Sequence, residues 1–118
     1  FESGGLAAAH AVHNGLTALS ECHHMLHGEK VTFGLLTQLA LENIPVCEFA
    51  DIVSFCKNVG LPTTLFELGL GNADDKRLML AAQAACADGE TIHNMPFAVT
   101  PDDVLAAMRL ADSLASEM

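Results

Sequence analysis

The sequence contains neither tryptophan nor tyrosine, and six phenylalanines are its only large aromatic side chains apart from histidine. β-Sheets use β-branched and aromatic residues, whereas alanine and leucine favour helices. Alanine and leucine dominate the 51% of residues that are hydrophobic. We therefore predict an all-α fold, a bundle of about five main helices that pack closely through small side chains. The 118 residues are enough for one domain with a hydrophobic core.

Basic residues are also scarce, with 5 lysines and arginines against 15 acids and a formal net charge of −10. No basic patch is present that could neutralise the phosphates of a nucleic acid or of an anionic membrane surface. No apolar run approaches the roughly 18 residues that a membrane-spanning helix needs. We expect neither a nucleic-acid partner nor a membrane location.

The four cysteines, Cys22, Cys47, Cys56 and Cys86, form no C-x-x-C pair. Cys47 and Cys56 lie in segments with helical apolar periodicity, where a buried free thiol is the expected state. Free thiols persist in a reducing compartment. The pattern therefore favours a cytoplasmic protein without a disulfide framework.

The ends of the sequence carry no processing signal. It begins at Phe1 without an initiator methionine or a signal-peptide pattern, and it stops at Met118 inside a helical pattern. We expect it to be an excerpt from a longer protein.

Apolar periodicity and capping residues predict where the helices begin and end. The first helix is rich in alanine, and its small polar surface predicts burial on most sides. Pro45 ends the second helix, and Gly60 occupies the position after the third. Thr100-Pro101-Asp102-Asp103 is a typical helix start. The predicted main helices begin near Ser3, His27, Val46, Asp74 and Thr100, with a short helical turn at 63–70.

Five of the six histidines lie within residues 4–30. His10 and His13 are three residues apart and share a helix face. His27 opens the next helix, 17 residues after His10, where the helix dipole disfavours a protonated imidazole and keeps the ring available as a ligand. Two imidazoles from neighbouring helices could bind one divalent metal. The alternatives are ordinary hydrogen-bonded histidines, or a three-histidine site that includes His13.

Several motifs together resemble a known family. They are FESGGLAAAHAVHNGLTAL, HHMLHGEKVTFGLLTQLALEN, NVGLPTTL, AACADGETIHNMPF and TPDDVLAAMRLAD. They look like the C-terminal helical domain of the glycerol dehydrogenase branch of the iron-containing alcohol dehydrogenase family, which is related in fold to dehydroquinate synthase. The resemblance covers essentially the whole chain and implies the C-terminal helical domain of a two-domain dehydrogenase.

The resemblance implies roles for individual residues. The first histidine of AAAHAVHNG and the histidine of HGEK bind the catalytic metal in the family, and here these are His10 and His27. The metal is Zn²⁺ in this branch, with Fe²⁺ as the alternative. The third protein ligand is an aspartate from an upstream helix that has no counterpart in this chain. Phe1 would lie near the substrate, and His13 would lie beside the ligands without being one.

The resemblance also implies an activity. The complete enzyme would use NAD to oxidise glycerol, or a similar small polyol, to dihydroxyacetone by metal-assisted hydride transfer. Residues 1–118 would form the metal-binding helical domain of a homo-oligomer, while NAD would bind to an N-terminal domain that is absent here. Consistently, the nine glycines form no G-x-G-x-x-G loop. We therefore expect the isolated chain to be inactive as a dehydrogenase.

Two alternatives remain open at this point. The chain could be a non-catalytic helical fragment or assembly module from a split or truncated gene. It could also be a helical metal carrier that uses His10, His13 and His27.

Overall fold

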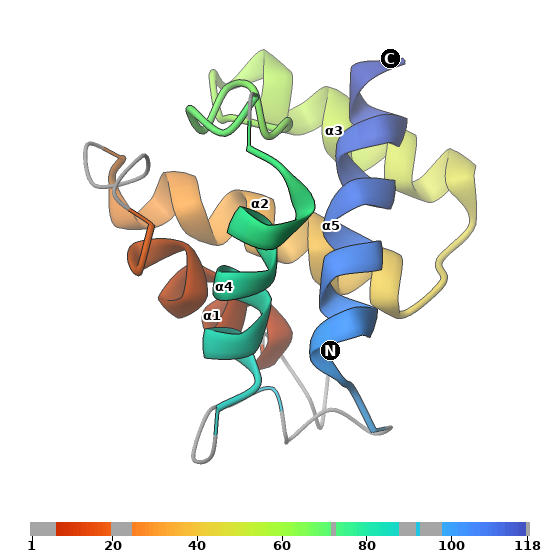
Figure 1. Cartoon of the computed structure of the whole chain (residues 1–118). Helices are drawn as coiled ribbons and strands as arrows, with labels where there is room; N and C mark the ends of the chain where they lie inside the picture. Colours follow the sequence, from red (N-terminus) through yellow and green to blue (C-terminus); the bar gives the residue numbers. More distant parts are fainter. Residues whose placement is uncertain (1–6, 20–24, 72, 88–91, 93–97, 118) are drawn as a thin grey trace.

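The computed structural model describes residues 7–19, 25–71, 73–87, 92 and 98–117. These residues contain five α-helices and no strand, so the predicted all-α bundle is confirmed (Figure 1). None of the helices in the described ranges is long and apolar enough to cross a membrane. The helices are α1 (Ala7–Thr17), α2 (His27–Leu41), α3 (Val46–Asn58), α4 (Asp75–Ala85) and α5 (Pro101–Ser116).

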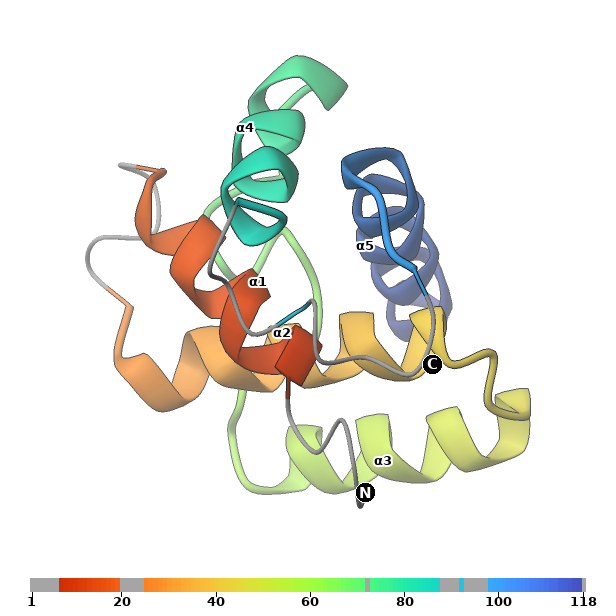
Figure 2. The ribbon, with the colours of Figure 1, turned by 90° about the horizontal axis from the view of Figure 1, so that it is seen from below.

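Four of the helices form a closed ring of contacts. α1 packs on α2, α2 on α5, α5 on α4, and α4 on α1, whereas α3 makes smaller contacts with α2 and α5. Figure 2 shows α3 on the side of α2 away from α4. One core of buried side chains fills the bundle, including Phe33, Phe49 and Met108. α2 is thus the helix on which α1, α3 and α5 all pack.

α1 is buried on most sides, as the sequence predicted, and exposes one polar stripe. Its small and apolar residues Ala8, Ala11, Val12 and Leu16 are fully covered. The exposed residues His10, Asn14 and Thr17 are three or four residues apart and so lie on one side of the helix. The polar side chains gather on a single outer face because the alanine-rich face alone packs on both α2 and α4.

Two glycines allow the helices of the ring to approach unusually closely. A Cβ atom added to Gly34 of α2 would collide with the backbone carbonyl of Ala9 in α1. A Cβ atom added to Gly15 of α1 would collide with the backbone carbonyl of Ala81 in α4. Backbone atoms cannot move aside as a flexible side chain can. The positions of α1 against α2 and α4 therefore depend on these two residues having no side chain.

Capping residues mark the start of α4 and α5 and the end of α3, as the sequence predicted. The Thr100 hydroxyl accepts the N–H of Asp103 at 3.2 Å, and the Asp103 carboxylate accepts the N–H of Thr100 at 2.9 Å. Asp74 caps α4 by accepting the N–H of Arg77 at 2.9 Å. Gly60 follows α3 with φ +83°. Gly89, predicted to close α4, lies outside the described residues.

The segment 63–70 forms the predicted helical turn and is fixed to α5. The Leu68 N–H donates to the Thr64 carbonyl at 3.3 Å, and the Glu67 carboxylate accepts the Thr63 N–H at 2.9 Å. The Leu65 N–H donates to the Asp112 carboxylate of α5 at 2.8 Å. This segment therefore covers one end of the core.

We predict that Gly34→Ala lowers the free energy of unfolding by about 2 kcal/mol, because the new methyl group forces α1 and α2 apart. Gly28→Ala in the same helix is the matched control. Nothing lies within 4 Å of a Cβ at Gly28, so this change should leave stability unchanged or raise it by up to about 1 kcal/mol. Urea unfolding followed by circular dichroism measures both. Equal effects of the two substitutions would contradict the close approach.

Candidate metal site

The predicted ligands lie on two helices that contact each other. His10 belongs to the first half of α1 and its side chain is exposed. His27 is the first residue of α2, as predicted, although its side chain is not described. The predicted substrate residue Phe1, and His23, His24 and His93, lie outside the described residues.

Contacts along the helix pair show that α1 and α2 run in opposite directions. Ala9, which precedes His10, lies against Gly34 of α2. At the other end, the Lys30 ammonium donates to the Thr17 hydroxyl at 3.2 Å. Gly34 follows His27 by seven residues, which is about 10 Å of rise along α2. Both predicted ligands therefore belong to one pair of packed helices. The backbone of α1 beside His10 contacts the middle of α2, whereas His27 lies at the start of α2.

The remaining residues of the HGEK motif have structural partners. Glu29 accepts the backbone N–H of Leu26 at 2.8 Å, which satisfies a free donor at the start of α2. Lys30 is only 8% exposed, and the Thr17 hydroxyl that it contacts donates in turn to the His13 carbonyl at 2.9 Å. Glu29 thus fixes the first turn of α2, where His27 lies, and Lys30 joins that turn to the end of α1. Sequence reasoning had assigned no role to either residue.

His13 is half-buried on α1 and contacts its own neighbour. Its Nδ1 atom lies 3.1 Å from the Asn14 side-chain oxygen, a hydrogen bond when that nitrogen carries the proton. In that tautomer Nε2 keeps its lone pair, and a metal-bound histidine commonly donates its other ring N–H to an oxygen in this way. The contact therefore does not decide between His13 as a ligand and His13 as a neighbour of the ligands.

The two predicted ligands, His10 and His27, are of a type that suits a divalent metal but are too few to complete a site. Two imidazoles suit Zn²⁺ or Fe²⁺, but a protein site for either metal normally has three or more ligands. Across the described residues, no group of three or more histidine, cysteine, aspartate or glutamate side chains could hold a metal ion. The predicted pair therefore needs a further ligand.

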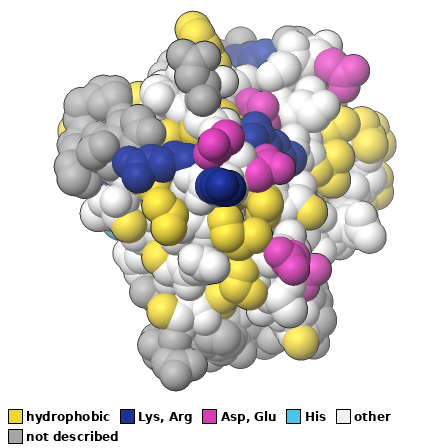
Figure 3. All heavy atoms as spheres, viewed as in Figure 1, with side chains coloured by type: hydrophobic (Ala, Val, Ile, Leu, Met, Phe, Trp, Pro, Cys, Tyr) yellow, Lys and Arg dark blue, Asp and Glu magenta, His cyan; other side chains and the backbone are white. Residues whose placement is uncertain are grey.

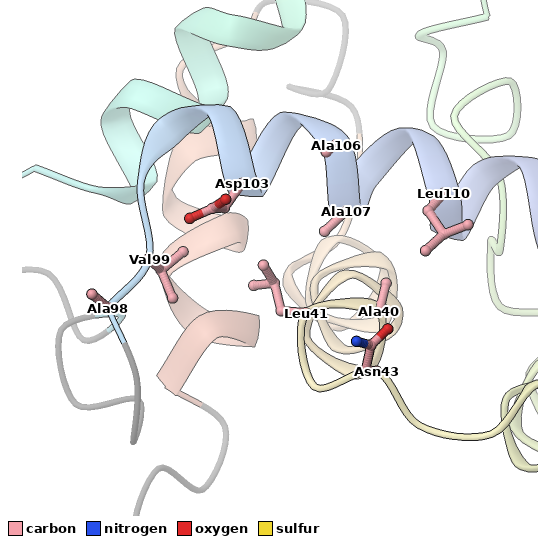
Figure 4. Close-up of a pocket in the computed structure, with 9 residues that line it drawn as sticks. All are labelled: Ala40, Leu41, Asn43, Ala98, Val99, Asp103, Ala106, Ala107 and Leu110. Atoms are coloured by element: carbon pink, nitrogen blue, oxygen red, sulfur yellow. The ribbon is translucent and has the colours of Figure 1, made fainter.

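A groove is lined by residues of α2, α5 and the segment directly before α5. It has a volume of about 360 Å³ and runs between the end of α2 and the start of α5 (Figure 4). Small and apolar side chains such as Leu41, Val99 and Ala107 line most of it. Its one carboxylate, Asp103, already accepts the Thr100 N–H. Neither predicted ligand is among the residues that line this groove.

Comparison with known proteins supports the resemblance seen in the motifs. No protein-family model matches the chain. A glycerol dehydrogenase of Citrobacter freundii is 56% identical over 117 residues, which are 99% of this chain and 32% of that protein. A glycolaldehyde reductase of Halobacterium salinarum is 50% identical over 114 residues, or 97% of this chain and 31% of that protein.

The fold agrees with the sequence matches. The crystal structure of a probable glycerol dehydrogenase from Sinorhizobium meliloti superposes with a TM-score of 0.92 at 39% identity. The match covers 95% of this chain and 32% of that one. The chain therefore resembles one part of these proteins and spans about a third of their length. In particular, its similarity to glycerol dehydrogenases is confirmed.

Two of the described cysteines, Cys56 and Cys86, are thiols of low reactivity. Cys47 is exposed, Cys56 is buried and Cys86 is half-buried. Burial raises the pKa of the Cys56 thiol. Burial also raises the pKa of the Cys86 thiol, and the negative charge of Asp103 raises it further. Only the thiolate is nucleophilic, so the raised pKa values make Cys56 and Cys86 poor nucleophiles at neutral pH.

We predict that an alkylating reagent at pH 8 modifies the exposed Cys47 first and Cys56 and Cys86 slowly. The rates at Cys56 and Cys86 should continue to rise above pH 9, because a raised pKa delays thiolate formation. Asp103→Asn should accelerate modification of Cys86 by removing the nearby charge, with Cys56 as the internal control. Peptide mass spectrometry follows each site. Acceleration at both cysteines would indicate general loosening instead.

Proposed function

We propose that the chain is the metal-binding C-terminal helical domain of a cytoplasmic, NAD-dependent glycerol dehydrogenase. The observation that carries this proposal is the 56% identity to a glycerol dehydrogenase of Citrobacter freundii across 99% of the chain. His10 belongs to α1 and His27 to α2, and these two helices pack on each other. The chain spans only about a third of its relatives, so the activity belongs to a longer protein. Cys56 is a buried thiol, the state expected of a cysteine in a reducing compartment.

His10 and His27 are the residues that would hold the metal, Zn²⁺ or alternatively Fe²⁺. The bound metal would act as a Lewis acid on a hydroxyl group of the substrate. A third ligand and the site for NAD would come from the part of the enzyme that this chain does not include. Phe1 would contribute to the apolar wall beside the substrate.

The chain's own contribution is to hold two imidazoles at a fixed spacing. The close approach at Gly34 fixes α1 on α2 near His10. The Lys30–Thr17 contact fixes the other end of α1 near the start of α2. Metal affinity depends on such preorganised ligands, because the cost of ordering them is met during folding.

The proposed substrate is glycerol or a similar small polyol. The relatives include proteins named as glycerol dehydrogenase and as glycolaldehyde reductase, and both names refer to small hydroxylated molecules. A small polyol is therefore the class that fits both kinds of relative.

A second candidate function is assembly without catalysis. Several large apolar side chains are exposed, among them Phe55 at 64%, Val59 at 56% and Phe66 at 80%. Hydrophobic side chains also gather at one edge of the face drawn in Figure 3. Exposed apolar patches favour association with a partner domain or a second copy. This candidate requires no metal, so histidine-dependent zinc binding would argue against it.

We predict weak zinc binding that depends on His10 and His27. A His10→Ala, His27→Ala double variant should bind zinc about tenfold more weakly or worse, because both proposed ligands are lost. Equilibrium dialysis at pH 7.5, with circular dichroism to confirm folding, measures the difference. Unchanged zinc uptake would refute the assignment.

His13→Ala is the matched control for this experiment. It removes one imidazole from the same helix but no proposed ligand, so zinc affinity should stay close to that of the unmodified chain. A loss as large as that of the double variant would support the three-histidine metal carrier instead.

We also predict that the isolated chain forms no NADH from glycerol and NAD, with or without added zinc. The two proposed metal ligands alone cannot position the cofactor and the substrate together, and the sequence has no G-x-G-x-x-G loop for NAD. Absorbance at 340 nm measures NADH, with a full-length glycerol dehydrogenase as the positive control. Glycerol-dependent NADH formation by this chain alone would contradict the proposed domain assignment.

A further inference from the structure

We propose that Gln38 is a positioning residue that holds His10 in place for metal binding. This inference rests on the proposed function, because it assumes that His10 is a ligand. Gln38 lies on α2, the helix that begins with His27. One helix would then fix both proposed ligands, one as its first residue and the other through the Gln38 side chain.

The first observation is a buried hydrogen bond between the two helices. The Gln38 side chain is fully buried, and its Oε1 atom accepts the backbone N–H of Ala9 at 3.0 Å. Ala9 lies in the first turn of α1, where backbone N–H groups have no acceptor within the helix. Gln38 therefore caps α1 from a neighbouring helix. His10 is the next residue of that turn.

The second observation concerns the orientation of the amide. A backbone N–H can donate only to the oxygen of a glutamine side chain, so this contact assigns Oε1 to the α1 side. The Nε2 atom then points the other way and donates to the Glu42 carboxylate at 3.4 Å. Both ends of the amide have partners, which limits its rotation and fixes the direction of the cap.

The third observation is that close backbone packing against Gly34 also fixes this turn of α1. Gly34 of α2 lies one helical turn before Gln38, and the Ala9 carbonyl occupies the space where a Gly34 side chain would be. The carbonyl and the N–H of Ala9 thus both face α2. His10 follows directly and is exposed on the outer side of α1. Its backbone is fixed while its side chain remains at the surface.

The test compares two substitutions of neighbouring buried residues. Gln38→Met keeps the length of the side chain but removes the acceptor. Thr37→Val is the matched control: Thr37 is also fully buried, and its hydroxyl donates only within α2, to the Phe33 carbonyl at 3.0 Å. The zinc affinity of each folded variant is measured by equilibrium dialysis, alongside urea unfolding.

We expect Gln38→Met to weaken zinc binding by about tenfold, the usual effect of losing a group that orients a metal ligand. Thr37→Val should leave zinc binding unchanged even if it lowers stability. Equal zinc affinity in Gln38→Met and the unmodified chain would overturn the inference, as would an equal loss in both variants. Zinc binding that requires His10 and His27 but ignores Gln38 refutes only this inference. Zinc binding independent of the two histidines refutes the proposed function as well.

A measurement on the unmodified chain keeps the inference testable if Gln38→Met fails to fold. Hydrogen exchange should show the Ala9 amide protected in the absence of metal, because its bond to Gln38 already exists in the fold. An Ala9 amide that exchanges as fast as an unprotected helix N-terminus would overturn the proposal.

Discussion

The structure depends most on the close approach of α1 to its two neighbours. Gly34 and Gly15 bring backbone against backbone on the two sides of this short helix, and alanine side chains fill the remaining contact. α1 has only 11 residues, too few to be stable alone in water. Its helicity therefore comes from packing, and so does the position of His10. A change in either contact would move the proposed ligand.

Polar contacts specify how this apolar packing is arranged. Small side chains alone would allow α1 to slide along α2, since one alanine resembles the next. Gln38 fixes the first turn of α1 through Ala9, and Lys30 fixes its last turn through Thr17. Among the described residues no buried side-chain nitrogen or oxygen lacks a hydrogen-bond partner. A shift of α1 by one residue would break both contacts and leave buried polar groups unpaired, which is costly.

The sequence predicted the features that depend on local chemistry. The reciprocal bonds of Thr100 and Asp103 and the left-handed Gly60 follow from neighbouring residues, so they could be read directly. The helix-initial position of His27 is of the same kind. The partners of Gly15 and Gln38 lie far away in sequence, so neither contact could be predicted from neighbouring residues.

The exposure of His10 fits a site shared between two parts of a larger protein. Burial of an unpaired imidazole in this core would cost desolvation energy without a partner to offset it. α1 avoids that cost by turning its polar face outward while its backbone is fixed from the inner face. A ligand fixed in this way can be presented to a second protein surface without rearrangement of the helix. In the proposed enzyme, the bundle would support two ligands of a metal site that a second part of the protein completes.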